Sequence, residues 1–250
     1  VAGNPLPESC DATCENVTDL ASSATTVDPI IHTVQQLGTG VSGRTFVSHN
    51  FFGPNALFGY TDDDGATWTS ASASPPNGGA DHQTVGSGPY PAGSPFKDLP
   101  NNPGYAVYFC SQTTALGFCA RSDNGGISFN PGTNFTDQRV CTGTGTIHGH
   151  VQVAPDGTVY VPNRICAGAQ AITVSTDAGL TWTQRKVPGT LNAQKDPAIG
   201  IASNNDIYFC YEAPNGGARV AVSKDRGATW INDRDITGPV GVVRARFVTA

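Results

Sequence analysis

The chain has 250 residues, of which only 14% are charged, and it carries a formal net charge of −6. A negative charge argues against a nucleic-acid partner, because phosphate backbones are bound by basic surfaces. No apolar run approaches the ~20 residues that span a bilayer. The chain has 30 glycines, 18 prolines and no methionine, a composition typical of a turn-rich, all-β protein.

The first 27 residues are rich in Ser, Thr and Ala, and we expect them to form a leader or linker with little core of its own. Because the chain starts at Val1 and not at Met, we expect it to be a processed or excised segment. Short strand-like segments separated by turn residues begin near Asp28 and continue to the end of the chain. The folded domain is therefore expected to cover residues 28–250.

An eight-residue pattern recurs four times in this domain, with the frame Ser/Thr-x-Asp/Asn-x-Gly-x-Thr/Ser-Trp/Phe. We call these segments the octapeptide repeats. Their third positions are 61, 53 and 48 residues apart. A period near 50 with strand-rich sequence between the repeats is typical of a β-propeller. The repeats occupy residues 61–68, 122–129, 175–182 and 223–230.

Each position of the repeat has a physical reason. The third residue can accept hydrogen bonds from backbone N–H groups ahead of it, and the glycine allows the positive φ that such turns need. The closing aromatic ring can bury about 150–250 Å² against a neighbouring blade. Four copies spaced around an array cannot converge on one substrate, so we expect a structural role. The residues concerned are Asp63, Asn124, Asp177 and Asp225, with Trp68, Phe129, Trp182 and Trp230.

The third repeat lies in the clearest predicted blade. It has an inner strand at 148–153, a hairpin turn at Asp156 and Gly157, further strands at 158–164 and 171–175, and an outer strand at 182–187. The fourth blade repeats this order at 196–202, 207–212, 219–223 and 230–236. The second blade begins near Asp81 and carries an insertion at 89–104, and the first is less regular.

Residues 242–249 are expected to form the inner strand of a fifth blade. A closed ring hides its strand edges, and six blades at this period would need about 300 residues. The predicted fold is therefore an all-β propeller of about four blades plus one strand, with an incomplete ring. The missing blades are expected from the rest of the chain or from another chain.

Seven cysteines are sorted by their positions in the predicted strands. Cys110 and Cys119 lie on successive strands of one blade, which makes a cross-strand disulfide plausible. Cys10 with Cys14 and Cys141 with Cys166 are the other candidate pairs, which leaves Cys210. Disulfides form in oxidising compartments, so we expect a secreted protein, either extracellular or periplasmic. No Cys or His spacing indicates a metal site.

Alignment of the blade entries gives the candidate site. It places five polar residues at the start of the inner strands, where they would form a ring at one mouth of the central channel. These residues are Asp28, Asp81, His148, Asp196 and Arg244, and their neighbours His82, His150, Lys195 and Arg246 would add to the ring. Two alternatives stay open: a wet channel mouth with only structural polar groups, and a calcium ion held by Asp28, Asp81 and Asp196.

The octapeptide repeats resemble the Asp-box, or bacterial neuraminidase repeat, of sialidase-like β-propellers, in which the box joins the third and fourth strands of a blade. Two copies have Ser, Asp, Gly, Thr and Trp at the fixed positions, one begins with Thr in place of Ser, and one carries Asn and Phe. The resemblance covers roughly residues 28–250. It implies a six-bladed ring in full and a function that involves glycans, and it implies no cofactor.

Sialidases use three arginines to clamp a sugar carboxylate, an Asp acid/base and a Tyr/Glu nucleophile pair. By resemblance, Arg164 matches one clamp arginine, and Arg244 or Arg246 would supply a later one. Asp81 or Asp28 would be the acid/base. The family Glu is replaced by His148, and no Arg-Ile-Pro motif occurs. Two hypotheses follow: an exo-acting glycoside hydrolase of sialidase type, or a non-catalytic propeller that binds a glycan or a protein.

Overall fold

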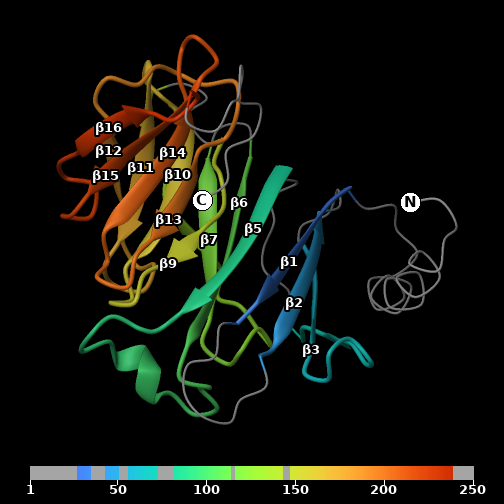
Figure 1. The fold of residues 1–250 in the computed structure, drawn as a ribbon. Coiled ribbons are helices and arrows are strands. Elements are labelled where there is room, and N and C mark those ends of the chain that lie inside the picture. The colour runs from blue at the N-terminus through green and yellow to red at the C-terminus, as the bar shows by residue number, and fades with distance from the viewer. Residues whose placement is uncertain are drawn as a thin grey trace, which may run out of the picture.

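The structure is a computed structural model that describes residues 27–34, 43–50, 56–72, 81–113, 116–142 and 147–238. Its described strands form four antiparallel sheets of four strands each, and the strands of each sheet follow one another in the chain. Each sheet corresponds to one blade (Figure 1). The predicted all-β propeller architecture is therefore confirmed. The fifth inner strand expected at 242–249 lies outside the described residues.

The strand bounds follow the octapeptide period. Blade one contains β1 (Val27–Thr33), β2 (Thr45–Asn50), β3 (Leu57–Thr61) and β4 (Thr69–Ser70). Blade two contains β5 (Asp81–Gly88), β6 (Ala106–Gln112), β7 (Gly117–Ser122) and β8 (Thr133–Asn134). Blade three contains β9 (Gln152–Val153), β10 (Val159–Cys166), β11 (Ala169–Ser175) and β12 (Thr183–Lys186). Blade four contains β13 (Ala198–Ile201), β14 (Ile207–Glu212), β15 (Ala218–Ser223) and β16 (Ile231–Asp235).

The blades stand side by side in an arc. The inner strand β5 lies against β1 on one side and β9 on the other, and β9 also contacts β13. In Figure 1 the first blade is at the right, the second is central, and the third and fourth are at the left. The insertion of blade two carries the 3₁₀ helix η1 (Pro95–Asp98) at the lower edge in this view. The inner strands therefore meet around one axis.

The hydrophobic core is divided among the seams between blades. One cluster joins blades one and two around Phe46, a second joins blades two and three around Tyr108, and a third joins blades three and four around Tyr160. The octapeptide aromatic of the later blade packs against each cluster, namely Phe129, Trp182 and Trp230. Alternate strand residues point to opposite faces, so blades two and three each contribute to two seams.

The inner strand of blade three is shorter than predicted. We expected residues 148–153 to pair continuously, but β9 contains only Gln152–Val153, and His148 forms an isolated bridge with Asn163. The intervening residue opposite is Pro162, whose carbonyl accepts from Gly149 N at 2.8 Å. Because proline has no N–H to donate in return, the ladder is interrupted there.

The octapeptide repeats form turns that are closed by their own side chains. In the third repeat, Asp177 accepts from the backbone N–H of Thr181 at 2.9 Å and from its hydroxyl at 2.5 Å. Ser175 Oγ accepts from Gly179 N at 2.9 Å. The second repeat makes the same contacts with an amide, since Asn124 Oδ1 accepts from Ser128 N at 2.9 Å. Each turn is therefore complete without an outside ligand.

An arginine from each of the first three blades reaches the turn of the following blade. Every acceptor is the carbonyl of the fourth octapeptide residue, which has a positive φ in all three cases. The pairs are Arg44 Nη1 to Gly125 O at 2.7 Å, Arg121 Nη1 to Ala178 O, and Arg185 Nη1 to Arg226 O at 2.5 Å. These arginines link neighbouring blades at the edge of the arc where the turns lie, and we call them the latch arginines.

Two disulfides join Cys110 to Cys119 and Cys141 to Cys166, the pairs favoured by the sequence. Cys210 is buried and forms no disulfide within the described residues. The candidate pair Cys10 and Cys14 lies outside the described residues. Across the described ranges, no helix has the length and apolarity needed to cross a membrane.

Candidate functional site

Side chains from three blades meet at the channel mouth where the inner strands begin. Asp196 precedes β13, and its Oδ2 lies 3.0 Å from Nε2 of His82 in β5. Its Oδ1 lies 3.6 Å from Nη1 of Arg164 in β10. The carboxylate therefore joins blade four to blades two and three. We call His82, His148, His150, Arg164 and Asp196 the mouth cluster.

Local backbone geometry directs these side chains to the axis. The register of β5 against β6 shifts between Asp81 and Thr84, and His82 within this bulge has a φ of 63°. Such a bulge re-aims a side chain, so His82 reaches Asp196 across the channel mouth. Arg164 is held by the 193–194 segment, because its carbonyl accepts from Ala193 N at 3.0 Å and its Nη1 donates to Gln194 O at 2.9 Å.

Asp196 is the electrostatic centre of the cluster. Burial raises the pKa of its carboxyl, but the hydrogen bond and charge of His82 and the charge of Arg164 outweigh this effect, and the pKa is lowered. The carboxylate is therefore ionised at neutral pH. Its side chain is 19% exposed, and its Oδ1 has no hydrogen-bond partner. The Arg164 Nε is also buried and without a partner. Both atoms are enclosed by the surrounding protein, and each has unused hydrogen-bonding capacity.

His148 lies beneath the mouth and does not line its surface. It is fully buried, and its ring packs edge-on against His82 and Phe135 at centroid distances of 5.5 Å. Burial is the main cause that lowers its pKa to about 3. Nδ1 lies 2.8 Å from the carbonyl of Gly149, which can only accept, so Nδ1 carries the proton and the buried Nε2 is left as an unpartnered acceptor.

The remaining candidates divide into two groups. His150 is exposed and interacts electrostatically with His82 and Asp196, and Lys195 is half-buried beside Asp196. Four candidates lie outside the description: the side chains of Asp28 and Asp81, and the whole of Arg244 and Arg246. The described residues contain no group of three or more His, Cys, Asp or Glu arranged to hold a metal ion.

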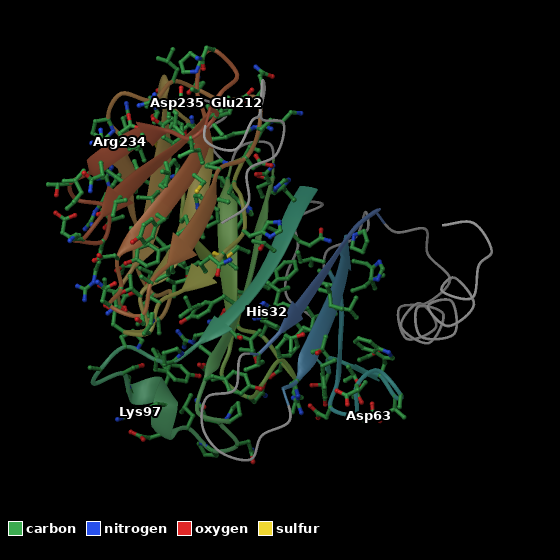
Figure 2. All side chains as sticks on the ribbon, in the orientation of Figure 1. His32, Asp63, Lys97, Glu212, Arg234 and Asp235 are labelled. Carbon is green, nitrogen blue, oxygen red and sulfur yellow. A yellow bond between two sulfur atoms is a disulfide. The ribbon has the colours of Figure 1, made fainter. Side chains whose placement is uncertain are left out.

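A pocket of about 490 Å³ adjoins the mouth cluster on the blade-four side. It lies between the 192–194 segment, which is bound to Arg164, and the 213–216 turn that follows β14. Glu212, at the end of β14, lines it with a side chain that is largely buried and accepts from Gln194 N at 3.2 Å. Figure 2 shows Glu212 at the upper edge of the molecule and Asp63 of the first octapeptide repeat at the lower edge.

Glu212 is a lining residue that the sequence analysis did not include. Tyr211 and Glu212 are adjacent on a strand, so their side chains are expected to point to opposite faces. The structure agrees on that point, since Tyr211 packs in the seam between blades three and four, whereas Glu212 lines the pocket. The signal that could have found Glu212 is the antiparallel pairing of Ala198 with Cys210, which brings the end of β14 to the level of Asp196.

A fourth histidine lies deeper along the axis. His32 in β1 has its Nε2 2.8 Å from Ser87 Oγ in β5, and it stacks on Phe46 with ring centroids 6.4 Å apart. Burial lowers its pKa to about 4. A single histidine in an irregular blade gave no sequence signal for this contact.

No protein-family model matches the chain, and no curated protein matches it. Solved structures match it in fold. A variant of Aleuria aurantia lectin in complex with α-methyl-L-fucoside has a TM-score of 0.58 and 12% identity over 89% of this chain. A protein of unknown function from Dyadobacter fermentans DSM 18053 has a TM-score of 0.52 and 14% identity over 85% of this chain.

A third match is NanB, a sialidase from Streptococcus pneumoniae, with a TM-score of 0.50 and 14% identity over 73% of this chain. The chain spans 66% of the lectin, 73% of the Dyadobacter protein and 28% of NanB. At these identities the matches establish a shared fold and nothing finer. The chain has a β-propeller fold that is also found in a lectin and in a sialidase.

Proposed function

We propose that this protein binds glycans at the channel mouth, through the mouth cluster and the adjoining pocket. The carrying observation is that the partly exposed Asp196 joins His82 and Arg164 from two other blades, and that a pocket lies beside the segment bound to Arg164. A concave surface with a few convergent polar groups is the usual form of a small-ligand site, and a pocket of this volume falls in the usual range.

The charge balance favours a neutral, hydroxyl-rich ligand. Arg164 lies beside the ionised Asp196, so the two charges largely compensate each other. The pocket adds the Glu212 carboxylate and the side chains of Asn192, Gln194 and Asn215. Carboxylates accept hydrogen bonds from hydroxyl groups, and amides both donate and accept. Such a lining suits the alternating donors and acceptors of a sugar better than it suits an anion.

The comparisons support this proposal at the level of fold. Two of the matched propellers are a lectin bound to a fucoside and a sialidase. The resemblance of the octapeptide repeats to the Asp-box points to the same broad group of proteins. The two disulfides are compatible with a secreted protein, extracellular or periplasmic, which we include in the proposal.

Glycoside hydrolysis is the second candidate. It is favoured by an ionised carboxylate, Asp196, placed 3.0 Å from an imidazole that can carry a proton. Glycosidases pair one group that protonates the leaving oxygen with another that stabilises positive charge. In a sialidase-type reaction Arg164 and Arg244 or Arg246 would grip an acidic sugar, with Asp28 or Asp81 as acid/base.

Binding and turnover are separated by two measurements. Titration calorimetry with methyl α-L-fucoside and with a sialoside is expected to show that the neutral sugar binds more tightly, and Asp196→Asn should abolish that binding. Asp206→Asn is the matched control, because Asp206 is another poorly exposed aspartate but pairs with Lys224 away from the mouth. Loss of binding in both variants, or in neither, would contradict the proposal. A fluorogenic sialoside cleaved by the wild type and not by Arg164→Ala would establish the hydrolase instead.

A further inference from the structure

Every seam between neighbouring blades uses the same two positions. An aliphatic residue of the inner strand packs toward the preceding blade, and an aromatic residue of the second strand packs toward the following blade. Sheet register identifies the equivalent positions, because the pairing in each blade can be counted from the first octapeptide residue. The aliphatic set is Ile31, Val85, Val151 and Ile199, and the aromatic set is Phe46, Tyr108, Tyr160 and Tyr208.

Three seams are filled, and two halves are left open. Val85 with Phe46, Val151 with Tyr108, and Ile199 with Tyr160 belong to the three core clusters, and none of the six side chains is more than 5% exposed. By contrast Ile31 at the start of the arc is 68% exposed, and Tyr208 at its end is 42% exposed. Blade one therefore exposes the aliphatic residue of a seam, Ile31, and blade four exposes the aromatic residue of a seam, Tyr208.

The latch arginines show the same asymmetry. Arg185 in β12 pairs across the sheet with Ile172, and Arg234 in β16 pairs with the equivalent Val220. Arg185 donates to the octapeptide of the next blade, whereas Arg234, within the described residues, only approaches the carbonyl of its neighbour Asp233 at 3.5 Å. Arg234 thus occupies the position of a latch arginine, but within the described residues it donates to no octapeptide carbonyl.

The missing acceptor is present at the other end of the chain. Asp64 is the fourth residue of the first octapeptide repeat, with a φ of 57°, and the three latch arginines donate to the equivalent carbonyls of the later repeats instead. It belongs to a run of three exposed carboxylates, Asp62 to Asp64. Asp62 is paired with Arg44, so within the described residues it is the Asp64 carboxylate that complements the exposed Arg234 in charge. Blade one therefore carries the acceptor for Arg234 and the aliphatic side chain for Tyr208.

We propose that two copies of this chain associate head to tail, with blade one of one copy docked on the exposed face of blade four of the other. Ile31 packs against Tyr208 of the second copy, and Arg234 of the second copy donates to the carbonyl of Asp64. The contact repeats the three seams already present in each copy. It is heterologous, because the two surfaces differ, and it can close a ring or extend further. This proposal does not rest on the glycan site.

Sedimentation equilibrium of the 250-residue protein over a wide concentration range tests it. Self-association should be detected, and Arg234→Ala and Tyr208→Ala should each weaken it about tenfold or more, because Arg and Tyr dominate such contacts. Both side chains are exposed, so the melting temperature should stay unchanged. Arg185→Ala is the matched control at the equivalent position of blade three: it should lower the melting temperature and leave association intact.

A mixing experiment tests the polarity of the contact. Ile31→Glu removes the surface of blade one, and Arg234→Ala weakens the surface of blade four. Each variant alone should stay monomeric at concentrations where the wild type associates, but their mixture should form a one-to-one pair through the remaining intact surfaces. A wild type that is monomeric at every concentration, or association that none of these substitutions weakens, would overturn the proposal and leave the two half-seams to another occupant.

Discussion

The octapeptide turns and the channel mouth both contain carboxylates, but the two regions use them in opposite ways. In the turns, Asp63, Asp177 and Asp225 each bind the backbone N–H and the hydroxyl of the residue four positions ahead. At the mouth, Asp196 joins separate blades, and one of its oxygens has no hydrogen-bond partner. A saturated carboxylate contributes to stability, whereas a partly exposed carboxylate among convergent polar groups can also bind a ligand.

Substitution in an octapeptide turn should produce the largest loss of stability. Gly227 has a φ of +80°, and a Cβ there would lie 2.7 Å from Ile172 Cγ2 in the preceding blade. Gly227→Ala should cost about 3 kcal/mol in urea unfolding, from left-handed strain plus overpacking. Gly168→Ala is the control with the same sign of φ and no atom within 4 Å, and it should cost about 1 kcal/mol. Equal costs would show that the seam contact is unimportant.

Acidification should lower the stability contributed by His148 at a higher pH than the stability contributed by the octapeptide turns. The pKa of His148 is lowered to about 3, so between pH 6.5 and 3 the unfolded chain binds a proton that the folded chain does not. Stability therefore falls as the pH falls in this window, by about 2 kcal/mol from pH 6.5 to 5 for this one group. Urea unfolding at several pH values measures the slope.

The turns should behave differently in acid. The Asp225 pKa is lowered to about 2, chiefly by hydrogen bonds from Thr229, so its contribution is present above the unfolded pKa near 3.8 and is lost only as the pH falls through about 2. NMR titration of the His148 imidazole provides the control. A ring that titrates near pH 6.5 would contradict the assignment of the earlier loss to the axis.

Removal of one turn carboxylate should have a moderate effect. Asp177→Ala loses the bonds to Thr181 and should destabilise the protein by about 1.5 kcal/mol, since each net hydrogen bond contributes about 1 kcal/mol. Asp177→Asn should cost less, because Asn124 already fills the same position in the second repeat. Thermal denaturation compares the two variants, and neither should change sugar binding. A change in affinity would link the turns to the mouth.

The smallest effect is expected for a charged pair that belongs to neither region. Arg139 Nε lies 3.0 Å from Asp137 Oδ1, but its side chain is 90% exposed. Exposed pairs of this kind contribute little because solvent screens them. Arg139→Ala should be indistinguishable from the wild type in melting temperature and in affinity, and so sets the baseline for the other variants.

Most of the fold could be predicted because each octapeptide repeat contains the groups that close its own turn. The position of such a turn depends on local sequence, so the strands between the repeats could be placed to within a few residues. The exception is the inner strand of blade three, where Pro162 interrupts the ladder from the neighbouring strand. That effect depends on which residue lies opposite, and it cannot be read from the inner strand alone.

The candidate site could be predicted only in part. Equivalent positions of the blades brought His148 and Asp196 to one level, but their depth depends on packing: His148 is buried under His82 and does not face solvent. The latch arginines could not be predicted from the sequence because they occupy different positions in their blades. Arg44 precedes β2, Arg121 lies in β7 and Arg185 lies in β12. No common spacing marks them, although they bind the same carbonyl position.

The latch arginines join only adjacent blades, and this determines where the molecule begins to unfold. An array held by nearest-neighbour contacts loses structure from its ends, because a terminal unit is fastened on one side and an internal unit on two. Within the arc, blades two and three have two seams each, whereas blades one and four have one. Hydrogen exchange should therefore be slowest in β6 and β10 and fastest in the outermost sheets, and any partner that covers an end should slow exchange there first.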